Sequence, residues 1–217
     1  MRPLYEQYRP TSLDDVVGND KTIARLRLMQ ERGGLGGKVF WLSGLSGTGK
    51  TTIARLIAAS VADEFNTIEI DAKDLTVDKL ADFRRVCRFK AITGPGFHAF
   101  VVNEAHNMRA EIVSRLQTIL EEEQVQVTST WVFTTTTDGQ QKLFDTKFDA
   151  EAFLSRAIMF ELGSRGKELD FATRVMHIAQ TEGLDGRPLG DYLDLAKRCT
   201  CNMRKMINEV ESGAMLV

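Results

Sequence analysis

The sequence has few of the features that stabilise secreted or membrane-spanning proteins. Its three cysteines, Cys87, Cys199 and Cys201, are an odd number without a CxxC pair, so neither a disulfide framework nor a complete zinc site is expected. We expect them to be small buried side chains. No run reaches the roughly 18 apolar residues of a membrane span, and the polar N-terminus does not resemble a signal peptide. These absences predict a cytoplasmic protein that does not contact a membrane.

Neither sign of charge dominates the sequence. The formal net charge is −2 and the pI is about 6.0. A protein that gripped DNA through its whole surface would be basic, so any contact with nucleic acid should come from a local patch. The chain has 217 residues and is 43% hydrophobic, with only four prolines. This composition predicts one larger globular domain followed by a smaller one.

Short apolar runs alternate with helical patterns through the first three quarters of the chain. Residues 1–20 carry three helix-disfavouring residues and are expected to form loops. We expect strands at residues 38–43, 67–70, 98–102 and 130–135, and helices at 19–32, 51–62, 77–89 and 109–122. Strands that alternate with helices predict an α/β fold with a parallel sheet covered on both faces.

The last quarter of the chain has a different pattern. From about residue 163 no strand is expected, and three helices are expected at 168–181, 189–198 and 202–212. We therefore predict two domains, an α/β nucleotide-binding domain at residues 1–162 and a small all-helical lid at 163–217.

A glycine-rich segment follows the first expected strand and precedes a helix. Residues 44–51, GLSGTGKT, fit the G-x-x-x-x-G-K-[ST] template of P-loop nucleotide-binding proteins. The glycines allow backbone N–H groups to surround phosphate oxygens, and the following helix directs its positive end toward the same anion. Lys50 would contact the β- and γ-phosphates of ATP, and the Thr51 hydroxyl would bind Mg²⁺. The predicted phosphate-binding residues are Gly44, Ser46, Gly47, Thr48, Gly49, Lys50, Thr51 and Thr52.

A second motif stands at the end of the third expected strand. Residues 100–104, FVVNE, have the form of a Walker B strand, which delivers two polar groups to the ligand-binding edge of a sheet. The first is usually Asp, but here it is Asn103, which offers an oxygen without a charge. Glu104 would orient the attacking water. Two interpretations stay open: an ATPase weakened at the metal site, or a subunit that binds ATP without hydrolysing it.

Several segments resemble one family, the AAA+ ATPase subunits of DNA clamp loaders, both replication factor C and bacterial gamma/tau. The resemblance includes residues 5–18, YEQYRPTSLDDVVG, the run IDAKD at 70–74, and NEAHNM at 103–108 followed by LQTILEE at 116–122. It implies that Tyr8, Arg9, Val16 and Val17 line the adenine pocket.

Three further residues receive roles from this resemblance. Residues 133–138, FTTTTD, resemble the sensor 1 segment, with Thr137 as the residue that contacts the γ-phosphate or the water. Residues 154–157, LSRA, resemble the motif that presents an arginine finger to a neighbouring subunit, with Arg156 as the finger. Ala157 replaces a cysteine of that motif, and residues 142–153 are expected to be an insertion. Residues 201–208, CNMRKMIN, resemble the Gly-Asp-Met-Arg-Lys segment, whose arginine is sensor 2, here Arg204.

The expected helix from residue 77 carries five basic and two acidic residues up to residue 90. In the clamp-loader family, helices in this region follow the DNA phosphates. The predicted DNA contacts are Lys79, Arg84, Arg85 and Arg88. A solvated helix face is the alternative interpretation of this charge pattern.

The resemblance implies a subunit that couples ATP binding and hydrolysis to assembly on primed DNA with a sliding clamp and other AAA+ subunits. It ends after the sensor 2 helix, so the C-terminal collar of clamp loaders is not represented, and we expect a truncated chain or a minimal relative. The alternatives are a hydrolysis-deficient, ATP-bound structural subunit and another DNA-maintenance ATPase.

Overall fold

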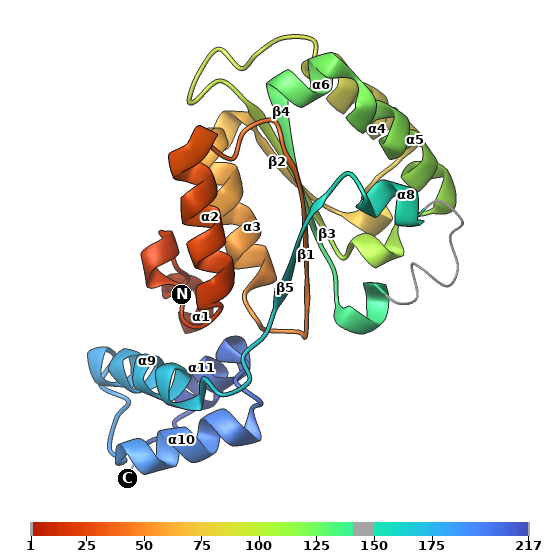
Figure 1. Ribbon diagram of the computed structural model, residues 1–217. Helices are drawn as coiled ribbons and strands as arrows, with labels where there is room; N and C mark the ends of the chain where they lie inside the picture. The colour runs from red at the N-terminus through yellow and green to blue at the C-terminus, as the bar shows by residue number, and fades with distance from the viewer. Residues whose placement is uncertain (1, 141–149, 217) are drawn as a thin grey trace.

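A five-stranded parallel sheet forms the centre of the protein (Figure 1). The computed structural model describes residues 2–140 and 150–216. The strands are β1 (Val39–Gly44), β2 (Thr67–Asp71), β3 (His98–Asn103), β4 (Ser129–Thr134) and β5 (Ile158–Leu162). Their order across the sheet is β2-β3-β4-β1-β5, and all four pairings are parallel. The predicted α/β fold is therefore confirmed, and the carboxyl ends of all five strands meet at one edge.

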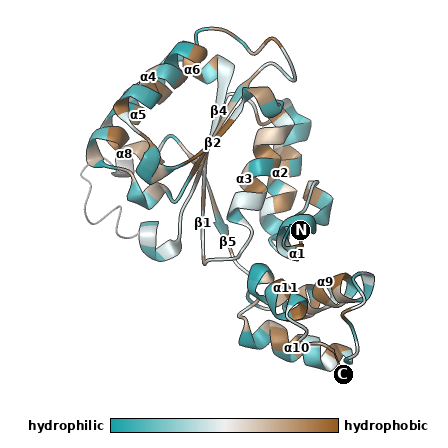
Figure 2. Ribbon diagram, turned by 180° about the vertical axis from the view of Figure 1, so that it is seen from behind, coloured by the Kyte–Doolittle hydropathy of each residue, from teal (hydrophilic) through white to brown (hydrophobic). Residues whose placement is uncertain are grey.

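Helices cover both faces of the sheet because the central strands are apolar on both sides. Each face has its own apolar core, one containing Phe40 and Leu42 and the other Trp41 and Trp131. The first face is covered by α2 (Asp20–Gly33) and α3 (Lys50–Val61), and the second by α4 (Val77–Val86), α5 (Ala110–Glu121), α6 (Glu123–Thr128) and α8 (Ala150–Leu154). Figure 2 shows hydrophobic colour on the strands and on the inner sides of these helices. Short 3₁₀ helices lie at η1 (Leu13–Asp15), η2 (Glu64–Asn66), η3 (Ala72–Asp74) and η4 (Ala105–Asn107).

The C-terminal part is a separate helical layer at the carboxyl edge of the sheet (Figure 1). It contains α9 (Glu168–Thr181), α10 (Leu189–Arg198) and α11 (Met203–Glu211). These helices share a third apolar core, to which α1 (Leu4–Gln7) contributes the buried Leu4. The backbone N–H of Leu4 also donates to the carboxylate of Glu211. The N-terminal segment therefore links the helical layer to the sheet, and the proposed boundary at residues 162/163 remains a prediction.

The structure corrects three expectations drawn from the sequence. Residues 1–20 were expected to be loops, yet α1 and η1 lie there, because packing against α11 stabilises a helix too short to have a periodic pattern. The helix expected to reach Phe89 ends at Val86, and Phe89 is 75% exposed, so it contributes nothing to the helix's apolar face. β5 was not predicted. It is an edge strand with alternating exposure, whereas the central strands are continuous apolar runs.

The predicted insertion at residues 142–153 lies largely outside the described residues, and only its last four positions fall within α8. Cys87, Cys199 and Cys201 are buried and unbonded, as predicted. Within residues 2–140 and 150–216, no helix is long and apolar enough to cross a membrane.

Candidate nucleotide site

The glycine-rich loop joins β1 to α3 at the carboxyl edge of the sheet. Gly47 and Gly49 have φ angles of 80° and 93°, which L side chains rarely adopt. A Cβ built on Gly47 would also lie 2.2 Å from the side chain of Asn202. The loop is held on one side by Asn19, whose amide donates to the carbonyl of Thr48 at 3.1 Å. The backbone conformation therefore favours glycine at both positions. At Gly47 there is also no space for a Cβ.

Lys50 lies inside this loop and is only 8% exposed. Its ammonium donates to the carbonyl oxygens of Gly44 at 3.0 Å and Leu45 at 2.7 Å. Burial lowers the pKa of Lys50 and nearby Arg204 adds to the effect, while the Glu104 carboxylate raises it. A buried ammonium that donates to two carbonyl dipoles is well placed to bind an anion.

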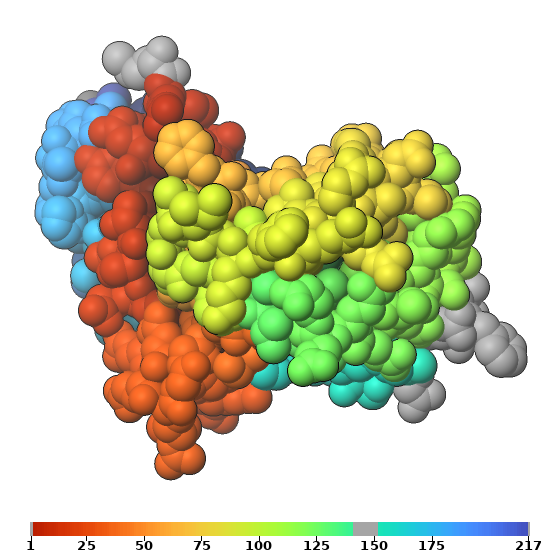
Figure 3. Space-filling view, turned by 90° about the horizontal axis from the view of Figure 1, so that it is seen from above, coloured from red at the N-terminus to blue at the C-terminus, as the bar shows by residue number. Residues whose placement is uncertain are grey.

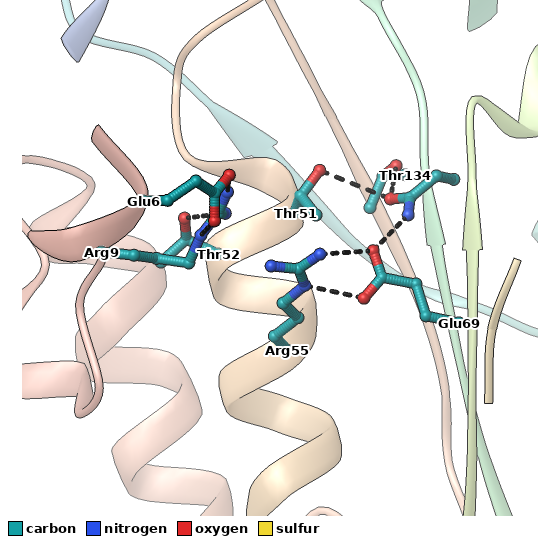
Figure 4. Close-up of polar contacts among 8 residues, drawn as sticks. Glu6, Arg9, Thr51, Thr52, Arg55, Glu69 and Thr134 are labelled. Atoms are coloured by element: carbon teal, nitrogen blue, oxygen red, sulfur yellow. Dashed lines mark hydrogen bonds and ion pairs between the residues drawn. The ribbon is translucent and has the colours of Figure 1, made fainter. Parts of the chain in front are cut away.

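A hydrogen-bond network surrounds Asn103 at the end of β3, and Figure 4 labels its partners Thr51, Glu69 and Thr134. The hydroxyls of Thr51 and Thr134 donate to Asn103 Oδ1 at 3.4 Å and 3.0 Å. Asn103 Nδ2 donates to Glu69 on β2 at 2.7 Å, and Arg55 on α3 donates to the same carboxylate at 2.7 Å and 3.1 Å. The network thus joins α3, β2, β3 and β4 at one point.

The oxygen atoms near Thr51 fit a hard cation such as Mg²⁺, which prefers hydroxyl, amide and phosphate oxygens. Among the residues that the structure describes, no group of three or more His, Cys, Asp and Glu could hold a metal alone. A cation here would be held by Thr51 and Asn103 together with oxygens of the nucleotide.

Glu104 follows Asn103 and lines the cavity beside Lys50. Its φ of 53° places it in the left-handed region, a strained conformation for a non-glycine residue. The side chain is 49% exposed, and one carboxylate oxygen lies 3.3 Å from His106 Nε2. The strained backbone turns the chain sharply at the strand end and directs the carboxylate toward the cavity.

Two adjoining cavities lie between the loop and the helical layer, and they share Tyr8, Gly47, Gly49 and Met203 among other residues. The first is polar and is lined by Tyr5, Tyr8, Arg9, Pro10, Ser46, Gly47, Gly49, Lys50, Thr51, Thr52, Glu104, Met203, Arg204 and Ile207. The second is mainly apolar and also contains Asp15, Val16, Val17, Thr48, Phe171, Arg174 and Ile178. The cationic cavity suits phosphates, and the apolar one suits a flat aromatic base.

The N-terminal segment is held in place by polar contacts with both layers. Arg9 donates to the hydroxyl of Thr52 at 3.1 Å and pairs with Glu6 (Figure 4). The hydrogen bond from Arg9 lowers the pKa of Glu6. Tyr8 donates to Glu182 after α9 at 2.6 Å, and this bond raises the pKa of Tyr8. Tyr8 lines both cavities and Arg9 lines the polar one, so the N-terminal segment forms part of the wall of the site.

The helical layer contributes Arg204, from the first turn of α11. Its guanidinium lies 5.3 Å from the centre of the Tyr5 ring, a cation–π contact. Two successive residues before α11, Thr200 and Cys201, have positive φ angles of 50° and 52°. This turn brings Asn202 against the phosphate loop, where its amide donates to the Ser46 carbonyl at 3.2 Å.

Two predicted site residues lie away from the cavities. Thr137 is exposed and three residues beyond β4, and the threonine that bonds to Asn103 is Thr134. Arg156 lies after α8 and is one-third exposed, where it pairs with Glu121 and donates to the carbonyl of Ala152. Neither residue lines the two cavities. The structure therefore places Arg156 on the surface, away from both cavities.

The predicted DNA residues separate into two groups. Arg84, Arg85 and Arg88 line a groove between α4 and α5, with Arg115 and Glu122 of the α5 region on the opposite wall. Arg84 pairs with Glu122 at 2.8 Å and Arg85 with Asp82 at 3.1 Å. Lys79 does not line this groove, and its ammonium donates to the carbonyl of Asp74 in η3, just before α4.

A further surface lies at the opposite, amino end of the strands (Figure 3). Phe65, Phe89 and Ile92 are 94%, 75% and 100% exposed. Their loops are joined by a 2.8 Å hydrogen bond from Asn66 to Thr93. We call Phe65, Phe89 and Ile92 the apolar loop surface.

Sequence reasoning missed several cavity residues. Tyr5 falls within the quoted N-terminal segment, but no residue pattern singled it out. Phe171 and Ile178 belong to the apolar face of α9, and Arg174 interrupts that face beside the cavity. Glu69, which bonds to Asn103, and Arg115, in the groove between α4 and α5, line neither cavity and belong to no motif. Only the fold brings these side chains to the site.

A family profile and several relatives match most of the chain. The profile described as "ATPase family associated with various cellular activities (AAA)" matches residues 40–160. A replication factor C small subunit from Methanosphaera stadtmanae is 30% identical over 216 residues, which is 97% of this chain and 63% of that protein. Replication factor C small subunit 1 from Pyrobaculum arsenaticum is 28% identical over 97% of this chain and 61% of its own length. The chain thus spans less than two thirds of the length of these curated relatives.

Solved structures agree with the fold. A point variant of RuvB from Thermotoga maritima superposes with a TM-score of 0.70 at 21% identity, covering 94% of this chain and 64% of that one. The replication initiator DnaA bound to AMPPCP and single-stranded DNA superposes with a TM-score of 0.65 at 16% identity, covering 97% and 65%. At these identities the likeness describes the fold alone.

Proposed function

The chain belongs to the AAA family of ATPases and resembles replication factor C small subunits in sequence, and we propose that it binds ATP with Mg²⁺ and acts as a clamp-loader-like subunit. The observation that carries the proposal is the meeting of three segments at one cavity. Lys50 comes from the glycine-rich loop, Glu104 from the end of β3, and Arg204 from α11.

Each side chain has a distinct task in this proposal. The loop N–H groups and Lys50 bind the phosphates, and Val16 and Val17 cover the base. Thr51 and Asn103 hold Mg²⁺, which neutralises charge on the phosphates when bound. Glu104 orients the water that attacks the γ-phosphate. Arg204 belongs to the helical layer, so its contact with the nucleotide would draw that layer toward the sheet.

We assign the completion of the site to a neighbouring subunit. Arg156 lies on the surface and away from its own cavity, so it would act on the nucleotide of an adjacent chain. Primed DNA would bind along the groove of Arg84, Arg85 and Arg88 through sequence-independent phosphate contacts. The apolar loop surface faces away from the nucleotide and suits a protein partner such as a sliding clamp.

One observation favours a second candidate function. Asn103 supplies no charge to the metal site, so an ATP-bound structural subunit with little turnover is the alternative. In that case nucleotide would hold the helical layer against the sheet and stabilise an assembly without being consumed.

The test is Mg²⁺-dependent ATP hydrolysis by the purified chain, with and without primed DNA, beside a Glu104→Gln control. DNA-stimulated hydrolysis that falls by about 10²-fold or more in the control supports the clamp-loader-like ATPase. Nucleotide binding without turnover under either condition supports the structural subunit. Absence of nucleotide binding would refute both functions.

A further inference from the structure

The side chain of Asn103 must be held in one orientation, whereas an aspartate in its place would need none. A carboxylate presents two equivalent oxygens, whereas an amide presents one oxygen acceptor and one NH₂ donor. Only the oxygen can accept from Thr51 or contribute to a cation site. If the amide turned over, it would direct N–H groups toward the cation, so its orientation must be fixed by other groups.

Glu69 fixes that orientation. Asn103 Nδ2 donates to Glu69 Oε1 at 2.7 Å, while Oδ1 accepts from Thr134 at 3.0 Å and Thr51 at 3.4 Å. An ionised carboxylate only accepts hydrogen bonds, so the NH₂ end of the amide must face Glu69. The reversed orientation would place the amide oxygen against the carboxylate and leave two hydroxyls facing N–H groups.

Arg55 in turn fixes Glu69. Its guanidinium donates two hydrogen bonds to the carboxylate, at 2.7 Å and 3.1 Å, in the fork geometry that restrains both groups (Figure 4). Arg55 lies four residues after Thr51 on α3, so both project from one side of that helix. The bonds therefore form a closed circuit from α3 through β2 and β3 back to α3.

We propose that Glu69 is a positioning residue for the cation site: it locks the Asn103 amide with its oxygen toward Thr51, and so allows an asparagine to act at this position. This inference rests on the proposed binding of ATP with Mg²⁺. Outer groups that orient metal ligands contribute about 10–100-fold to metal affinity in other proteins. The contribution of Glu69 to nucleotide affinity should accordingly require both the bound cation and the amide of Asn103.

The experiment measures the affinity of the non-hydrolysable analogue AMPPNP in excess Mg²⁺ and in EDTA. Four proteins form a cycle: the natural chain, Glu69→Gln, Asn103→Asp, and the double variant. A glutamine at position 69 can offer either end to the amide and no longer selects its orientation. Glu111→Gln is the matched control, because Glu111 also pairs with an arginine, Arg115, without contacting Asn103.

We expect Glu69→Gln to weaken AMPPNP binding about tenfold in Mg²⁺ and less than about twofold in EDTA. In the Asn103→Asp background the same substitution should not weaken binding, since a carboxylate has no orientation to lose and Glu69→Gln removes a like charge that would face it. Equal loss in Mg²⁺ and EDTA, or equal loss in both backgrounds, would overturn the inference and leave the proposed function standing. If the natural chain binds no nucleotide, both this inference and the proposed function are overturned.

Discussion

The amide nitrogen of Asn202 lies 3.2 Å from the carbonyl oxygen of Ser46 and donates a hydrogen bond to it. The same side chain caps α11, because its oxygen accepts from the backbone N–H of Lys205 at 3.1 Å. One residue thus joins the phosphate loop to the helix that carries Arg204. Serine or aspartate could cap the helix, but neither offers the amide donor, and aspartate adds a negative charge beside the phosphate site.

We therefore predict that Asn202→Asp weakens ATP binding about tenfold, or about 1.4 kcal/mol. The unfolding free energy should fall by only about 0.5–1.5 kcal/mol, because the cap is kept and one hydrogen bond is lost. ATP titration and urea denaturation measure the two effects. Asn202→Ser, which also keeps a cap but adds no charge, separates repulsion from loss of the link. Unchanged ATP affinity in both variants would argue against a role for this contact.

Lys50→Met should separate nucleotide binding from folding. The buried ammonium costs desolvation energy, but it also makes two hydrogen bonds to loop carbonyls, so the nucleotide-free protein should change by less than about 1 kcal/mol. For the natural chain, ATP at 100 times its Kd adds about 2.7 kcal/mol, or about 5–10 °C in Tm. Thermal unfolding with and without ATP should show this rise for the natural chain and none for the variant. An equal rise in Tm for both proteins would show that Lys50 does not contribute to nucleotide binding.

The central fold was predictable because it depends on local patterns. Four strands and seven longer helices follow from apolar runs, helical spacing and the position of the glycine-rich loop. β5 was missed because an alternating edge strand of five residues resembles an exposed connection. α1 was missed because its stability comes from Leu4 packing against residues about two hundred positions away, which no local pattern encodes.

The site was predictable only where a motif fixes the spacing. Thr51 and Asn103 are 52 positions apart in the chain, and each belongs to a recognisable motif. Glu69 has no motif of its own, and its contacts with Arg55 and Asn103 arise because β2 pairs with β3 at the edge of the sheet while α3 packs on β3. The same reason explains Arg115, which reaches the basic groove only through the packing of α5 against α4.

The position of Arg156 allows a test of action between subunits. Arg156→Ala should leave ATP binding by the isolated chain unchanged, since the side chain does not line the cavities. Hydrolysis by the assembled protein should fall by about 10³-fold, the usual effect of removing an arginine finger. Mixing this variant with Lys50→Met should restore part of the activity, because one chain supplies the nucleotide site and the other the arginine. A mixture as inactive as its components would contradict action in trans.

The basic groove between α4 and α5 predicts a particular dependence of DNA binding on salt. Arg84 and Arg85 already pair with Glu122 and Asp82, so DNA must compete for them, whereas no ion pair is seen for Arg88 within residues 2–140 and 150–216. Each phosphate contact adds about 0.7–0.9 to the slope of log affinity against log salt. Replacing both Arg85 and Arg88 by alanine should therefore reduce that slope by about 1.4–1.8 and weaken all DNA sequences equally.

Fluorescence anisotropy with primed DNA over a range of salt concentrations measures this slope. The matched control replaces Arg187 and Arg198 by alanine, two arginines of the helical layer that lie outside the groove. Both double variants remove two positive charges, so they change the net charge of the protein by the same amount. A smaller slope in the groove variant alone identifies the groove as the DNA contact. An equal reduction in both would mean that DNA responds to the overall charge, and Arg84, Arg85 and Arg88 would then be a solvated helix face.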